Sequence, residues 1–248
     1  MSWDRDPFER FRNSTRARIG LGRAGDALPT TVILDFQLAH ARARDAVHGR
    51  VDFVALAKEL APASTIRVRS CATDRTVYLS RPDLGRQPLA ADLPGPGNSH
   101  DIAFVIADGL SASAVERHAV PLFKACMKRL GGFRVAPVIL GEQARVAFGD
   151  EAAAAFGAEV AIVLIGERPG LSVPDSLGAY ITFHPQAGRR DSERNCISNI
   201  HADGLSYEMA ADKIVWIVRE ALRLQLTGVD LKENAEGTAK VLFHEEPL

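Results

Sequence analysis

The most constraining feature of this 248-residue chain is an uninterrupted apolar run at residues 160–165. The turn at residues 166–170, which begins and ends with glycine, follows at once. A short apolar run closed by a turn is typical of a strand buried on both faces, as in parallel sheets. Similar runs at residues 102–106 and 135–140 alternate with helical stretches. This order predicts an α/β fold with a Rossmann-like, doubly wound, mostly parallel sheet.

The first part of the chain is predicted to be helical. Apolar residues recur at spacings of three and four over residues 32–47, which favours a helix from Thr30 or Thr31 to about His48. A second short helix is expected over residues 51–60, before Pro62. We therefore predict two domains. Residues 1–62 form an N-terminal arm and a small helical domain, and residues 63–248 form the Rossmann-like domain.

Further elements follow from local patterns. Alternating residues predict strands at 66–68 and 77–79, and later strands are expected at 179–183 and 195–200. The alanine-rich stretch 150–156 and residues 206–225 favour helices. A helix after residue 111 is expected to break at Pro121 and to restart there, ending at Gly131 and Gly132. Residues 94–98 are expected to form a loop.

Charge and cysteine content exclude several classes of protein. The formal net charge is −1, which gives no global attraction to nucleic acid. No apolar run approaches the roughly 20 residues of a membrane span. The three cysteines are far apart and form no CxxC pair, which indicates reduced thiols rather than a zinc site. The charged N-terminus lacks the apolar core of a signal peptide, so we expect a cytoplasmic protein.

One segment is locally basic: residues 10–23 carry five arginines and no acidic residue. The segment is either a solvated arm or an arm that docks on an acidic surface of a partner.

Three glycine-containing segments are candidates for ligand-binding loops. Residues 20–25 match GxGxxG by letter, but Pro29 precedes the expected helix and a preceding strand would be very short. A loop that needs positive φ explains these glycines better. The turns at 108–111 and 166–170 follow apolar strands, where α/β proteins bind ligands. In the second turn, Glu167 is either a hydrogen-bond acceptor for a large ligand or simply exposed beside Arg168.

Two other residues have plain structural interpretations. Ser111 is expected to cap a helix. Cys196 has no neighbouring base in the sequence and is expected to be a small buried residue.

Several segments, taken in order, resemble the small (light) subunit of ethanolamine ammonia-lyase. Their joint order over residues 16–225 is specific to this family. The matching segments are residues 16–25, 35–45, 79–86, 108–111, 166–171, 174–177 and 195–200.

The resemblance implies an activity and a partner. This family converts ethanolamine to acetaldehyde and ammonia by a radical rearrangement that depends on adenosylcobalamin. The substrate site is expected on a large subunit, in a hetero-oligomer of several large–small pairs, and no catalytic residue is expected here. The cofactor contacts that carry over are Val146, Glu167 and Cys196, with Arg145 and Arg168 as neighbours.

The sequence departs from the family pattern at two places, and two alternative functions remain open. The chain begins close to the first shared segment, whereas some family members carry a long extension linked to a bacterial microcompartment. Residues 87–99 are short and rich in proline and glycine, where the family often has a fuller helix. The alternative functions are a non-enzymatic corrinoid-binding module and a nucleotide-binding oxidoreductase.

Overall fold

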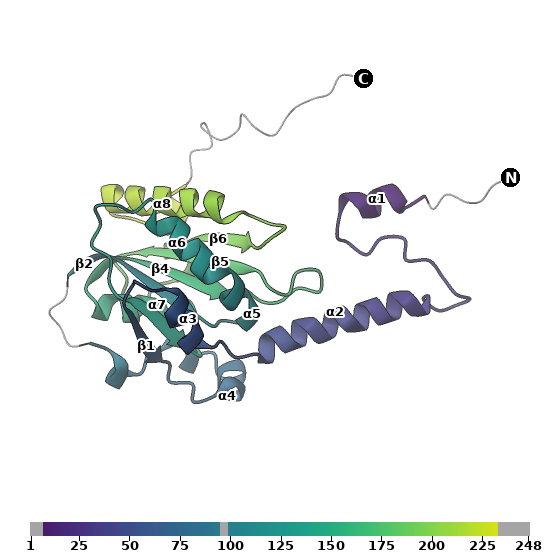
Figure 1. The fold of residues 1–248 in the computed structure, drawn as a ribbon, viewed down its shortest axis with the longest axis horizontal. Helices are drawn as coiled ribbons and strands as arrows, with labels where there is room; N and C mark the ends of the chain where they lie inside the picture. Colours follow the sequence, from purple (N-terminus) through teal and green to yellow (C-terminus); the bar gives the residue numbers. More distant parts are fainter. Residues whose placement is uncertain (1–6, 95–98, 233–248) are drawn as a thin grey trace, which may run out of the picture.

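The computed structural model describes residues 7–94 and 99–232 of the chain (Figure 1). The charged N-terminal residues 1–6 and most of the expected loop at 94–98 lie outside the described residues. The described part contains a six-stranded sheet with the strand order β1-β3-β2-β4-β5-β6. The strands are, in sequence order, β1 (Thr65–Arg69), β2 (His100–Ala107), β3 (Val138–Glu142), β4 (Ala158–Gly166), β5 (Leu177–Phe183) and β6 (Asn195–Ile200).

The sheet is mixed rather than fully parallel. Strands β1, β3, β2 and β4 run parallel to one another, whereas β5 is antiparallel to both β4 and β6. Parallel neighbours need a crossover connection, usually a helix. The connections at residues 167–176 and 184–194 contain no α-helix, so the chain turns back on itself there. The predicted α/β class is confirmed, and the parallel arrangement holds for four of the six strands.

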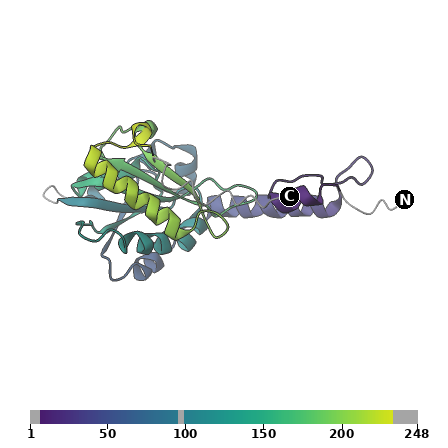
Figure 2. The same ribbon diagram turned by 90° about the horizontal axis from the view of Figure 1, so that it is seen from above.

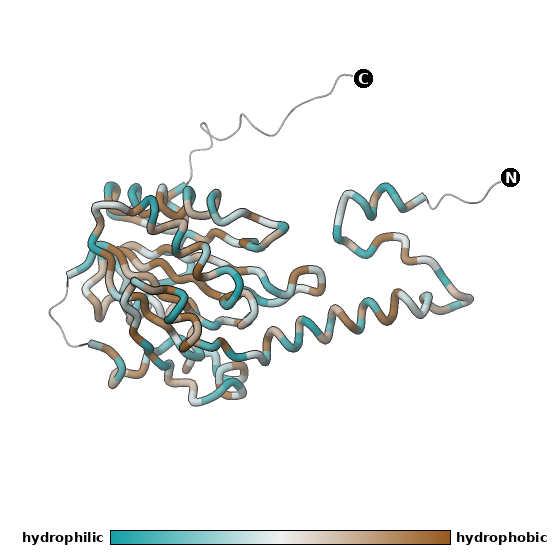
Figure 3. The backbone as a smooth tube through the Cα atoms, in the orientation of Figure 1, coloured by the Kyte–Doolittle hydropathy of each residue, from teal (hydrophilic) through white to brown (hydrophobic). Residues whose placement is uncertain are grey.

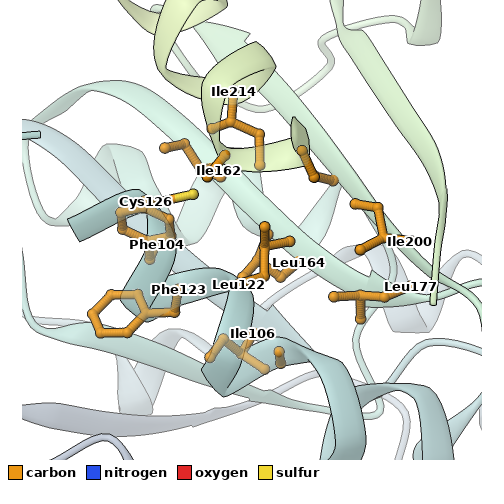
Figure 4. Close-up of a cluster of buried hydrophobic side chains, with 14 of the residues drawn as sticks. Phe104, Ile106, Leu122, Phe123, Cys126, Ile162, Leu164, Leu177, Ile200 and Ile214 are labelled. Carbon is orange, nitrogen blue, oxygen red and sulfur yellow. The ribbon is translucent and has the colours of Figure 1, made fainter. Parts of the chain in front are cut away.

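Helices cover both faces of the sheet. One face packs against α3 (Phe53–Glu59), α6 (Val120–Met127) and α8 (Tyr207–Leu224), and Figure 4 shows part of this core. The other face packs against α7 (Phe148–Ala155). Alternate residues of β2 separate accordingly: Phe104 faces the first layer and Val105 the second. Both are fully buried, as expected for a central strand with two covered faces.

Two local predictions need correction. Residues 77–79 were expected to form a strand but lie in α4 (Arg75–Ser80). The reason is Asp74, whose side chain accepts hydrogen bonds from the backbone N–H groups of Thr76 and Val77 and so caps a helix. The break expected at Pro121 is also absent. The chain stays helical through α5 (Ala112–Ala114), the π-helical turn Val115–Ala119 and α6, with Pro121 in the first turn of α6.

The N-terminal helices project from the sheet domain. Figures 1 and 2 both show α2 (Thr30–His48) extending away from the body. Helix α1 (Glu9–Ser14), which precedes α2 in the chain, lies on the same side of the body. The bounds of α2 agree with the prediction, yet only Ala46 is buried among its residues. Figure 3 shows apolar and polar segments alternating along this helix. Gly20, Gly22 and Gly25 all have positive φ, which confirms the loop interpretation of the GxGxxG match. The domain division at residue 62 stays a prediction.

Candidate functional site

A cavity of about 420 Å³ lies at the carboxyl ends of β2, β3 and β4. It contains residues from both turns singled out in the sequence, together with residues that follow β3. Four of the five predicted site residues line it: Arg145, Val146, Glu167 and Arg168. The other lining residues are Tyr78, Gly109, Leu110, Ile165, Gly166 and Tyr180. The fold thus brings together predicted residues that are separated in the sequence.

Glu167 is the acidic group of the cavity, and it is half-buried at the start of the connection from β4 to β5. Its Oε2 accepts a 2.5 Å hydrogen bond from the Ser176 hydroxyl and a longer 3.4 Å bond from the backbone N–H of Asn199. The backbone N–H of Glu167 donates to the Ser176 carbonyl oxygen at 2.9 Å. The position of Glu167 is therefore fixed through both backbone and side chain. The interpretation of Glu167 as simply exposed is wrong.

Arg145 is held by aromatic stacking. The guanidinium groups of Arg75 and Arg145 both lie over the Tyr78 ring, each with its Cζ 4.6 Å from the ring centre. Arg145 also donates from Nη2 to the Tyr78 carbonyl oxygen at 3.0 Å. Its Nε is buried and has no hydrogen-bond partner among the described residues. Burial raises the pKa of Tyr78 to about 12, so its hydroxyl stays protonated at neutral pH.

Asp108 fixes the turn that carries Arg145 and Val146. It is buried at the end of β2, and its carboxylate accepts hydrogen bonds from the backbone N–H groups of Gly109, Gln143 and Ala144 at 2.9–3.0 Å. Burial raises the pKa of Asp108 to about 6, while these N–H groups and Arg75 oppose the rise. Ser111 caps the following helix by accepting from the backbone N–H of Ala114, as predicted.

Cys196 lies beside the cavity rather than in its lining. It is exposed, so its predicted burial is wrong: in edge strand β6 its neighbour Ile197 faces the core and Cys196 faces outward. Tyr180, which lines the cavity, is its register partner on β5. Partial desolvation, followed by the interaction with Cys196, raises the pKa of Tyr180. Arg168 is exposed at the rim of the cavity.

Sequence reasoning missed three residues that shape the site. Tyr78 was placed in a strand, and its contact with Arg145 depends on tertiary packing. Tyr180 falls in a predicted strand with no local signal for a ligand. Ser176 precedes β5 by one residue, and its hydroxyl acts on a side chain nine positions earlier. Only the short distance between Glu167 and the next apolar run could have indicated that contact.

Two further observations bear on function. The described residues contain no group of three or more His, Cys, Asp or Glu side chains arranged to hold a metal ion. No described helix combines the length and the hydropathy that a membrane crossing requires.

The fold and cavity define an α/β protein with a shallow candidate ligand site at its strand ends and a projecting helical arm. Comparison with known proteins identifies the family. The sequence profile of the ethanolamine ammonia-lyase light chain matches residues 5–232. The small subunit of this enzyme from Azotobacter vinelandii is 50% identical over 242 residues, covering 93% of this chain and 90% of that protein. The small subunit from Pseudomonas syringae pv. tomato is 48% identical, covering 93% and 84%.

The chain belongs to the ethanolamine ammonia-lyase small-subunit family. It is accordingly a subunit of a carbon–nitrogen lyase, and its family depends on adenosylcobalamin. The designation of its relatives as small subunits implies a large-subunit partner.

Proposed function

We propose that this chain forms one wall of the adenosylcobalamin site of ethanolamine ammonia-lyase. Val146, Glu167 and Cys196 contact the cofactor, with Arg145 and Arg168 beside them. The observation that carries the proposal is the convergence of four of these residues on one cavity at the strand ends. In α/β sheets this edge is where ligands bind.

The chemistry of the cavity fits a corrinoid. A corrin ring combines an apolar face with a rim of carboxamide side chains, which both donate and accept hydrogen bonds. Val146 and Leu110 offer apolar contact, Glu167 accepts hydrogen bonds, and the guanidinium groups donate them. The buried Arg145 Nε, which has no partner among the described residues, is a donor available to such a carbonyl oxygen.

The size of the cavity indicates that this chain binds only part of the cofactor. A volume of about 420 Å³ is near the lower end of ordinary small-molecule sites. Adenosylcobalamin, with its corrin, nucleotide and adenosyl groups, is much larger than such a cavity. The remainder must therefore lie against another surface, which we assign to the large subunit.

The division of labour follows from this geometry. When bound, adenosylcobalamin supplies the radical chemistry that converts ethanolamine to acetaldehyde and ammonia. Residues of this chain bind and orient the cofactor, and we assign none of them a catalytic role. The acid–base groups and the substrate site belong to the large subunit.

The surface for the large subunit includes α2. This helix has two apolar stripes on opposite sides: one contains Ile33 and Phe36, and the other contains Leu34 and Leu38. All four side chains are exposed. A helix that is apolar on opposite sides is normally buried between other elements. The basic segment 10–23 extends this surface, and we propose that it docks on acidic groups of the partner.

We further propose that several large–small pairs assemble into one hetero-oligomer in the cytoplasm. A helix with two opposed apolar stripes can be covered on both sides in such an assembly. Packaging in a bacterial microcompartment is an alternative location.

Acetaldehyde release tests the proposed function. The chain is mixed with a cognate large subunit, ethanolamine and adenosylcobalamin, and each component is omitted in turn. We expect activity only in the complete mixture. An inactive complex that demonstrably assembles and binds cobalamin would instead favour a non-enzymatic corrinoid-binding module.

A further inference from the structure

The structure holds one oxygen of Glu167 and leaves the other available. Oε2 receives the hydrogen bonds from Ser176 and Asn199, whereas Oε1 receives none from the described residues. We infer that Ser176 is a positioning residue that fixes the Glu167 carboxylate so that Oε1 accepts one N–H group of the cofactor. This inference rests on the proposed contact between Glu167 and cobalamin.

Ser176 is suited to this role because its own position is fixed. Its carbonyl oxygen accepts the Glu167 backbone N–H at 2.9 Å, and the next residue begins β5. The loop before it is anchored as well: the Ser111 hydroxyl donates to the Pro174 carbonyl oxygen at 2.8 Å, and Arg117 pairs with Asp175 at 2.5 Å. The Ser176 hydroxyl is thus presented to Glu167 from a rigid strand end. Its 2.5 Å bond to Oε2 has the length of a charge-assisted hydrogen bond.

Gly178 provides the space that Glu167 occupies. A Cβ atom at this position would lie 3.0 Å from Glu167 Oε1 and 3.2 Å from its Cγ. Those distances are shorter than ordinary van der Waals contacts, so a side chain here would push the carboxylate away. Because Gly178 has no side chain, the Glu167 side chain can lie along β5 within hydrogen-bonding distance of Ser176.

This arrangement selects the chemical class of the recognised group. A carboxylate only accepts hydrogen bonds, so its partner must be a donor. The primary carboxamides of the corrin rim provide N–H donors, whereas a carboxylate on the rim would repel Glu167. The Ser176 bond also restricts Glu167 to few rotamers, which lowers the ordering cost when the cofactor binds.

Cobalamin binding to the assembled large–small complex tests the inference. The dissociation constant for cyanocobalamin is measured by equilibrium dialysis, with no turnover required. We expect S176A to bind about three- to tenfold more weakly, which corresponds to the net contribution of one ordinary hydrogen bond. S176T keeps the hydroxyl and is expected to bind within about twofold of the wild type. S172A is the matched control, because Ser172 is exposed on the same loop and makes no side-chain hydrogen bond among the described residues.

A double-mutant cycle separates positioning from a general structural effect. If Ser176 acts through Glu167, S176A has no additional effect on the dissociation constant when Glu167 is already alanine. An equal loss in both backgrounds, or wild-type binding by S176A, overturns the positioning role and leaves the Glu167 contact intact. Unchanged binding by E167A overturns the contact itself, and the role of Ser176 with it. In turnover, the half-saturating concentration of adenosylcobalamin should change more than the rate at saturation.

Discussion

Replacing Leu34 and Leu38 with glutamate should weaken assembly with the large subunit without unfolding the chain. The two residues lie one helical turn apart on one side of α2, and they are 57% and 50% exposed. Since their side chains contribute little to the core of the isolated chain, the free energy of unfolding of the double variant should lie within about 0.5 kcal/mol of that of the wild type. The same exposure makes them available to a partner.

The size of the effect follows from the area still exposed. Full burial of a leucine side chain contributes about 1.5–3 kcal/mol. Half of each side chain remains to be buried, so each contributes about 1 kcal/mol at the interface and both together about 2 kcal/mol. That loss corresponds to about 30-fold weaker binding, before any cost of desolvating the introduced carboxylates.

Isothermal titration of the large subunit with the variant chain provides the measurement. Met209→Glu is the control, because Met209 is 55% exposed but lies on α8 in the sheet domain. We expect the control to bind like the wild type. Wild-type affinity for the double variant would refute the assignment of this stripe to the interface. If the substitutions instead change the oligomeric state of this chain in the absence of the large subunit, the stripe mediates contact between two copies of the chain.

Three further predictions concern the stability of the site and its supports. Arg194→Met should destabilise the chain by about 3–5 kcal/mol in urea unfolding, because Asp150 would remain as a buried carboxylate without its 2.5 Å ion pair; a loss below about 1 kcal/mol would contradict this. Gly166→Ala should cost at least about 1–3 kcal/mol and abolish cobalamin binding, since the added Cβ would lie within 2.2 Å of the Ser111 carbonyl oxygen. For Asp108, whose pKa is raised from 3.8 to about 6, folding favours the protonated form, so its contribution to stability is fully present below about pH 3.8 and is lost as the pH rises through 6. The stability of the wild type relative to Asp108→Asn should therefore fall by up to about 3 kcal/mol between pH 4 and 7, and a pH-independent difference would exclude this titration.

The sequence predicted elements whose pattern is local. Helix α2 was placed correctly because its apolar residues repeat with helical spacing, and β4 because its apolar run is long and closed by glycine. The strand expected at residues 77–79 was wrong because alternation over three residues also fits one turn of helix. There the cap at Asp74 decides the outcome. The reversed direction of β5 could not be predicted, since an apolar run has the same composition in either orientation.

The site shows the same limit. Glu167 and Arg168 were predicted as site residues because they follow an apolar strand, where α/β sheets bind ligands, and their role stays a prediction. Tyr78 was missed because its importance comes from its contact with Arg145, which is distant in the sequence. The exposure of Cys196 was missed because burial at an edge strand depends on which face its neighbours cover, and a single strand does not specify this.

The cavity and the arm together argue against a self-sufficient ligand-binding module. A protein that binds a small molecule alone usually buries most of its ligand's surface, and this cavity is too small to do so for a corrinoid. Helices in proteins gain most of their stability from tertiary packing, yet among the residues of α2 only Ala46 is buried. Both deficits are removed by one partner that covers the open side of the cavity and the stripes of α2. A stand-alone corrinoid carrier or oxidoreductase would have to complete both features within one chain, and the described residues do neither.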